Sequence, residues 1–200
     1  MYVPHAFRMS DEHALLSLAA THPFATVISC APDDATRPTV SHLPLLVDAE
    51  GRRLRGHLAR ENPHCSQFAS GVDVLAIFHG PHAYVSPSVY AEQPSVPTWN
   101  YVVVHVRGRA RLVDEQGLQQ VLDDSVAHFD RTGWRLETDP AFLGPRLAAI
   151  AGFEIAIDEL EGKWKVSQNR SPADRARVAS WLDEGDEQSR ALAAIVRALG

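Results

Sequence analysis

One segment of the sequence, residues 98–113, constrains the possible folds more than any other. Its letters, TWNYVVVHVRGRARLV, alternate between two faces. One face would carry Val102, Val104, Val106, Gly108, Ala110 and Leu112, and the other would carry Tyr101, Val103, His105, Arg107, Arg109 and Arg111. Because alternation from one residue to the next is the pattern of a β-strand, the segment predicts a single long strand. Such length suits a bent strand of a barrel, with Gly108 at the bend.

Shorter strands are predicted on both sides of this segment. They cover residues 23–31, 38–47, 52–59 and 72–80, and two more strand segments within 152–169 meet around Glu161 and Gly162. In 52–59 an apolar face alternates with a basic face formed by Arg53, Arg55 and His57. The connection 80–98 is too long for a simple hairpin, and connections of this length are usually functional or disordered.

Helices are predicted at 11–20, 63–70, 115–130 and 142–150, and a final pair follows Ser171. Asn62 and Pro63 have the chemistry of an N-cap and a first turn, and Gly71 ends that helix. Gly185 separates the last two helices, the second of which would include Leu199. Strands with helices at the edges predict an α+β fold, a β-barrel with peripheral helices and a C-terminal helix pair. We expect one domain over 1–170, with 171–200 as its helical extension.

Composition excludes several classes of function. The net charge of −6 argues against a surface broadly suited to nucleic-acid backbone, which requires clustered Lys and Arg. Cys30 and Cys65 have no CxxC spacing, so we expect neither a disulfide framework nor a zinc site. No stretch has the length of a membrane span, and the first residues lack the layout of a secretory signal. We therefore expect a cytoplasmic protein that contacts no membrane.

The segment GHLARENPH, residues 56–64, is the first candidate for binding chemistry. It places His57, Arg60 and Asn62 where a strand turns into a helix start, and there backbone N–H groups and a cation can converge on a phosphate. A capped helix with a solvated arginine explains the same letters. His79 and His82 do not predict a metal site, because Gly80 and Pro81 between them exclude a helix.

Two further segments carry candidate ligands. In VPTWNYVVVH, Thr98, Trp99, Asn100 and Tyr101 would suit a planar heteroaromatic ligand, and an aromatic corner of the core is the alternative. In KWKVSQNR, Lys163, Lys165 and Ser167 share one strand face, and Arg170 follows. These groups could clamp a phosphate, or the lysines could guard an exposed strand edge.

Six segments taken together resemble one family. MYVPHAF, SHLPLL, GHLARENPH, AIFHGPHAYVSPSVY, VPTWNYVVVHVRGRARLV and KVSQNR follow one another between residues 1 and 170. They resemble the PaiB-type FMN-binding negative transcriptional regulators. The resemblance implies a split β-barrel related to the pyridoxamine-phosphate-oxidase-like flavoproteins, and a homodimer that binds FMN where the subunits meet. Val89 and Glu61 depart from the family pattern, which puts the shape of the pocket and its affinity in question.

The resemblance also implies roles for individual residues. Arg60, Lys165, Ser167 and Arg170 would bind the FMN phosphate, Trp99, Asn100 and Tyr101 would contact the isoalloxazine, and Ser86, His57, Asn62 and Thr98 would complete the site. We predict no metal and no catalytic residue, because no acid, base or nucleophile set has a recognisable spacing.

The function that follows is an FMN-binding transcriptional regulator of the PaiB type. The main alternative is an enzyme, a flavin-dependent reductase or oxidase that uses FMN held at the dimer interface. Haem binding through one of the histidines is a third hypothesis. Direct DNA binding is not expected, because acidic residues are interspersed among the arginines of the C-terminal helix pair, Arg175, Arg177, Arg190 and Arg197.

Overall fold

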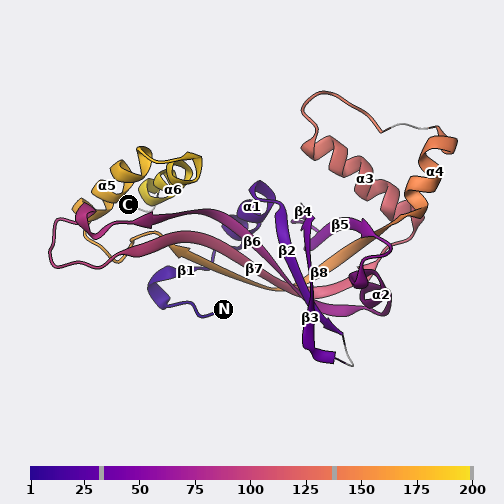
Figure 1. Ribbon diagram of the computed structural model, residues 1–200, viewed down its shortest axis with the longest axis horizontal. Coiled ribbons are helices and arrows are strands. Elements are labelled where there is room, and N and C mark those ends of the chain that lie inside the picture. Colours follow the sequence, from indigo (N-terminus) through magenta and orange to yellow (C-terminus); the bar gives the residue numbers. More distant parts are fainter. Residues whose placement is uncertain (32–33, 137–138, 199–200) are drawn as a thin grey trace. The chain divides into compact units, whose positions relative to one another are not determined.

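The computed structural model describes residues 1–31, 34–136 and 139–198, and its core is an eight-stranded antiparallel sheet (Figure 1). The strand order is β3-β2-β6-β7-β8-β5-β4, and β1 pairs with β8. The strands are β1 (Arg8–Met9), β2 (Phe24–Ala31), β3 (Asp34–Pro44), β4 (Leu46–Asp48), β5 (Arg53–Ala59), β6 (Val72–Val85), β7 (Thr98–Leu112) and β8 (Ile150–Lys165). The long strand predicted from alternation is therefore confirmed as β7.

The helices also follow the signals in the sequence. They are α1 (Glu12–Thr21), α2 (Pro63–Ser70), α3 (Glu115–Phe129), α4 (Pro140–Ala148), α5 (Pro172–Asp183) and α6 (Glu187–Ala198), with short 3-10 turns η1 (His5–Phe7) and η2 (Pro87–Val89). The Asn62 side chain accepts a hydrogen bond from the His64 N–H at 3.0 Å, which confirms the predicted cap of α2. Gly71 ends α2 with a φ of 72°. Leu199, predicted to lie in the last helix, is outside the described residues.

Strand β6 runs further than predicted. It continues to Val85, so the connection to β7 covers only residues 86–97 instead of 80–98. The extension includes Pro81, which has no N–H to donate. It lies beyond the stretch from Val74 to Ile77 in which β6 pairs with β2, so the missing N–H costs no hydrogen bond to β2.

The end of the sheet differs from the prediction as well. Residues predicted as two strand segments form the single strand β8, and Ile150 begins this strand instead of ending a helix. Gly162 does not break it. A Cβ at Gly162 would lie 2.1 Å from a Leu15 side-chain carbon, so glycine here permits the close approach of α1. The predicted strand 38–47 is likewise divided, into β3 and β4 on either side of Leu45.

Two compact units share the long strands. Unit 1 comprises Met1–Leu18, His79–His105 and the chain from Glu161 onward, and unit 2 comprises Ala19–Phe78 and Val106–Leu160. Strands β6, β7 and β8 contribute residues to both. In unit 1, helices α5 and α6 pack against each other, with Leu182 and Leu192 fully buried (Figure 1). In unit 2 the buried core includes Phe68, Phe78 and Phe153.

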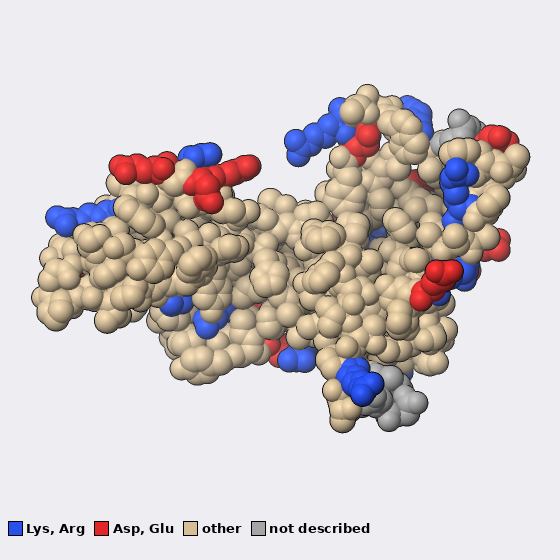
Figure 2. Space-filling model, viewed as in Figure 1, with Lys and Arg blue, Asp and Glu red and all other residues tan. Residues whose placement is uncertain are grey.

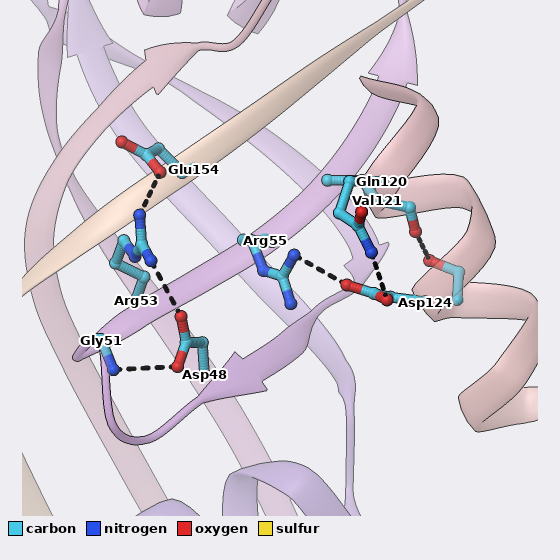
Figure 3. A network of polar contacts seen from close by, with 9 residues as sticks. Asp48, Gly51, Arg53, Arg55, Gln120, Val121, Asp124 and Glu154 are labelled. Carbon is cyan, nitrogen blue, oxygen red and sulfur yellow. Dashed lines mark hydrogen bonds and ion pairs between the residues drawn. The ribbon is translucent and has the colours of Figure 1, made fainter. Parts of the chain in front are cut away.

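The predicted basic face of β5 is neutralised within unit 2 (Figure 3). Arg53 contacts the carboxylates of Asp48 at 3.1 Å and Glu154 at 3.4 Å, and Arg55 contacts Asp124 of α3 at 2.8 Å. The N–H of Gly51 donates to Asp48, which lowers the pKa of that carboxyl, and Arg53 lowers it further. These arginines therefore tie β5 to β4, to β8 and to α3.

Candidate functional site

The predicted site residues fall into both compact units. Unit 2 holds His57, Arg60 and Asn62. Unit 1 holds the others, Ser86, Thr98, Trp99, Asn100, Tyr101, Lys165, Ser167 and Arg170. Within unit 1, seven of these side chains line two pockets, and Ser86 lines neither.

The first of the two, here called the basic pocket, is a small cavity of about 100 Å³. It is lined by Phe7, Tyr90, Val96, Pro97, Thr98, Asn100, Lys165, Ser167, Asn169 and Arg170. Five predicted site residues from β7, β8 and the turn after β8 therefore meet at one place. The connection 86–97 supplies one wall and is held in place by the buried carboxylate of Asp174, which accepts a hydrogen bond from the Ala91 N–H at 2.7 Å.

Two cations give this pocket its charge. The Lys165 ammonium donates to Thr98 Oγ1 and, at 2.9 Å, to the carbonyl oxygen of Trp99. The Arg170 guanidinium lies over the ring of Tyr90, with its Cζ 4.3 Å from the ring centroid. All of these partners are uncharged, and the ion pairs found in the described chain include neither cation. The pocket therefore offers two positive charges to an anion.

Asn100 adds a polar group that needs a partner. Its side chain is 1% exposed, and its Nδ2 donates to Ser167 Oγ at 2.9 Å. Its Oδ1 accepts no hydrogen bond from the described residues. Leaving such a group buried and unsatisfied costs about 1–3 kcal/mol. A ligand hydroxyl or N–H in the pocket would satisfy it.

The second cavity, here called the aromatic pocket, has a volume of about 420 Å³. It is lined by Met1, His79, Gly80, His82, Trp99, Tyr101, Val102, Val103, His105 and Lys163. The rings of His82 and Trp99 lie 5.8 Å apart at 33°, and Tyr84 lies 6.3 Å from Trp99. Trp99 is nevertheless 49% exposed, so a planar ring can reach its indole face.

The alternation of β7 separates residues that the sequence analysis grouped together. Trp99 and Tyr101 line the aromatic pocket, whereas Thr98 and Asn100 line the basic pocket. Consecutive side chains of a strand point to opposite faces, so adjacency in the sequence does not bring these four to one surface. Asn100, predicted to contact the isoalloxazine, lies with the residues predicted to bind the phosphate.

The remaining predicted residues have contacts of their own. Ser86 caps η2 by accepting a hydrogen bond from the Ser88 N–H at 3.3 Å. Arg60 donates through Nε to the carbonyl oxygen of Ala148 at 3.0 Å, and Asn62 caps α2. Burial lowers the pKa of His57, which favours its neutral form. The sequence analysis left a capped helix as the alternative for GHLARENPH, and the structure shows this cap at Asn62.

Several lining residues were missed by the sequence analysis. Phe7 and Tyr90 lie far from β8 in sequence, and Asn169 lies within KVSQNR without having been selected. In the aromatic pocket the missed residues are His79, His82 and His105. Lys163, grouped in the sequence with Lys165 and Ser167 as a possible phosphate clamp, lines the aromatic pocket instead. For His105 a signal existed, because it occupies the same face of β7 as Tyr101, which had been selected.

A buried polar cluster occupies unit 2. His64 is fully buried, its Nδ1 lies 2.8 Å from Ser41 Oγ, and Asn62 Nδ2 donates to the same Oγ at 2.9 Å. The ring also stacks on Phe68 at a centroid distance of 5.0 Å. Burial lowers the pKa of His64 below its usual value, and a backbone contact with Thr39 opposes this effect. The cluster fixes the start of α2 against β3.

The lowered pKa of His64 predicts a pH-dependent stability. Above its ordinary pKa of 6.5 the imidazole is neutral in both the folded and the unfolded chain. As the pH falls through that value, the unfolded chain binds a proton that the folded chain does not, so the free energy of unfolding falls by up to about 1.4 kcal/mol per pH unit. Urea unfolding of the wild type and of His64→Gln from about pH 8 to pH 5 tests this. The variant should lose part of the slope, and an unchanged slope would contradict the assignment.

Comparison with solved structures identifies the class of fold. The chain is similar to an FAD- and haem-binding protein from Mycobacterium smegmatis, with a TM-score of 0.62, 20% identity, and coverage of 79% of this chain and 73% of that one. It is also similar to the flavocytochrome Anf3 from Azotobacter vinelandii, with a TM-score of 0.60, 17% identity, and coverage of 80% and 70%. At these identities the likeness concerns the fold alone. The fold is the predicted split β-barrel, within the α+β class.

Sequence comparison identifies the family. Residues 1–159 match the family model described as "Putative FMN-binding domain". The chain is also 31% identical, over 91% of its length and 89% of the relative's, to the protease synthase and sporulation protein PAI 2 of Bacillus subtilis. This chain belongs to the PaiB-type FMN-binding family, as the sequence predicted, and its cofactor is FMN. In the described part of the chain no helix has the length and apolar character needed to cross a membrane.

Proposed function

We propose that the protein is a homodimeric, FMN-binding regulator in which the basic pocket takes the FMN phosphate and the aromatic pocket takes the isoalloxazine. The observation that carries this proposal is the pairing of Lys165 and Arg170 beside the unsatisfied Asn100 Oδ1 in one small cavity. Phosphate oxygens suit the two cations, and a ribityl hydroxyl suits the amide oxygen. The residues of both pockets therefore fit the cofactor of the family.

The homodimer is supported by the placement of the pockets on β7. Side chains of Thr98 and Asn100 leave β7 on the opposite face from those of Trp99 and Tyr101, and the two sets line separate pockets. A second copy of the chain would bring the set that one face lacks to the same flavin. Exposed apolar side chains in unit 1 support such an interface: Tyr2 is 84% exposed, Val96 69% and Tyr84 46%.

A regulatory role is proposed in place of an enzymatic one. Bound FMN would supply electron or hydride exchange, while the residues of this chain bind and orient it. The C-terminal helix pair is not a basic surface: acidic and basic side chains lie side by side over it (Figure 2), and Arg197 pairs with Asp183. Any effect on transcription would therefore act through a partner and not through direct contact with DNA.

Comparative titration with FMN and riboflavin tests this proposal. Because riboflavin lacks the phosphate, we expect FMN to bind at least tenfold more tightly, the equivalent of about 1.4 kcal/mol. Sedimentation of the loaded protein should give the mass of two chains. Equal affinities, or a monomer that binds FMN fully, would refute the proposed site. Steady turnover of bound FMN with a nicotinamide donor and an acceptor would replace the regulator by the oxidoreductase.

A further inference from the structure

Lys163 and Lys165 are the only lysines in a sequence with 19 basic residues. They lie two positions apart near the end of β8, and each lines a different pocket of unit 1. All the other Lys and Arg residues of the sequence are arginines. A lysine ammonium differs from a guanidinium because it is a compact point charge on a flexible stem. The two lysines therefore place one such charge at each pocket.

Aromatic rings and a backbone carbonyl oxygen surround the Lys163 ammonium. Its Nζ lies 5.4 Å from the ring centroid of Tyr101 and 5.6 Å from that of Tyr2, and it donates to the Tyr2 carbonyl oxygen at 3.1 Å. The nearby carboxylate of Glu161 is bound at 2.8 Å by the amine of Met1. Among the described residues, no ion pair includes Lys163. Two aromatic faces and one carbonyl hold an ammonium weakly compared with a carboxylate.

Lys163 also differs from Lys165 in what it can reach. Lys165 donates to Thr98 and to the Trp99 carbonyl within the basic pocket. Lys163 lines the aromatic pocket together with Trp99 and Tyr101, the residues proposed to contact the isoalloxazine. A flavin ring in this pocket would have an ammonium beside it in a partly desolvated setting, where charge interactions are stronger than in water.

We propose that Lys163 tunes the electron affinity of the bound flavin by stabilising the negative charge that the ring acquires on reduction. This inference rests on the proposed function, because it requires the ring in the aromatic pocket. Lys165 then governs phosphate binding, which is the same for oxidised and reduced FMN. Lys163 governs the preference of the site for the reduced form over the oxidised one.

The reduction potential of FMN bound to Lys163→Met tests the inference. Methionine keeps most of the length of lysine and removes the charge. We expect the preference for reduced FMN to fall by about tenfold, which lowers the potential by about 30 mV for a two-electron couple. Lys163→Arg, which keeps the charge, should retain most of the wild-type potential. Lys165→Met is the matched control: it should weaken both redox states equally and leave the potential in place.

A footprint of the two lysines separates failure of this inference from failure of the proposed function. Acetylation of the amines, followed by peptide mass spectrometry, is run with FMN, riboflavin or inorganic phosphate. Riboflavin should protect Lys163, phosphate should protect Lys165, and FMN should protect both. If bound FMN protects neither lysine, the proposed site itself is wrong. If FMN protects Lys165 but Lys163 still reacts at its free rate, or if Lys163→Met loses thermal stability without any change in potential, the tuning role is overturned.

Discussion

Replacing Gly108 with alanine is expected to lower the free energy of unfolding by about 3 kcal/mol. A Cβ at this position would lie 2.0 Å from the carbonyl oxygen of Ala156. The obstacle is the backbone of β8, which cannot rotate aside as a flexible side chain can. Strand β7 would have to move away from β8 and lose hydrogen bonds in the centre of the sheet.

Urea unfolding monitored by tryptophan fluorescence measures this change, and Gly144→Ala is its control. Gly144 lies within α4, and a Cβ there would meet no atom within 4 Å. Alanine is favoured over glycine in a helix, whereas Pro145, the next residue, disfavours a Cβ in helical backbone, so the control should change the stability by no more than about 1 kcal/mol. A Gly108→Ala variant as stable as the control would refute the close approach of the two strands.

Gly108 shows which features of this fold the sequence periodicity predicts and which it does not. Alternation predicted β7 nearly to the residue, and Gly108 predicted a bend in the strand, where the structure shows a close approach of the β8 backbone. The partner at that contact, Ala156, could not be predicted, because strand pairing across 48 positions depends on packing and not on a local signal. The same limit applies to β8: Gly162 reads locally as a break, but in the structure it pairs with Met9 of β1 and allows the close approach of Leu15.

The candidate site was predictable where its residues belong to short motifs. Lys165, Ser167 and Arg170 were selected from KVSQNR, and the structure brings them together with Thr98 and Asn100. The sequence analysis placed Trp99 and Asn100 against the same ring. They are neighbours in the sequence, but side chains alternate along β7, so they line different pockets. Phe7 and Tyr90 belong to MYVPHAF and AIFHGPHAYVSPSVY, but nothing local in these segments predicts that they pack beside the end of β8.

Arg170→Ala is expected to weaken FMN binding by about 100-fold, the equivalent of about 2.7 kcal/mol. The guanidinium can donate two parallel hydrogen bonds to a phosphate, and such charge-assisted bonds are the strongest single contacts available in this pocket. Its position over the Tyr90 ring, 4.3 Å from the centroid, holds the charge in place before the ligand arrives. Little conformational freedom is then lost on binding, so removal of the side chain costs most of the interaction.

Titration of the apo protein with FMN measures this loss, with Arg177→Ala as the matched control. Arg177 is exposed on α5 and lines neither pocket. Solvent screens an exposed charge outside the site from the phosphate, so Arg177→Ala should leave the FMN affinity within about twofold of the wild type. Arg170→Lys should recover part of the affinity, since it keeps the charge but not the paired donors. Riboflavin separates the two contributions: if Arg170 binds the phosphate, its removal should hardly change riboflavin affinity. A loss of equal size for both flavins would place Arg170 against the ring and not against the phosphate.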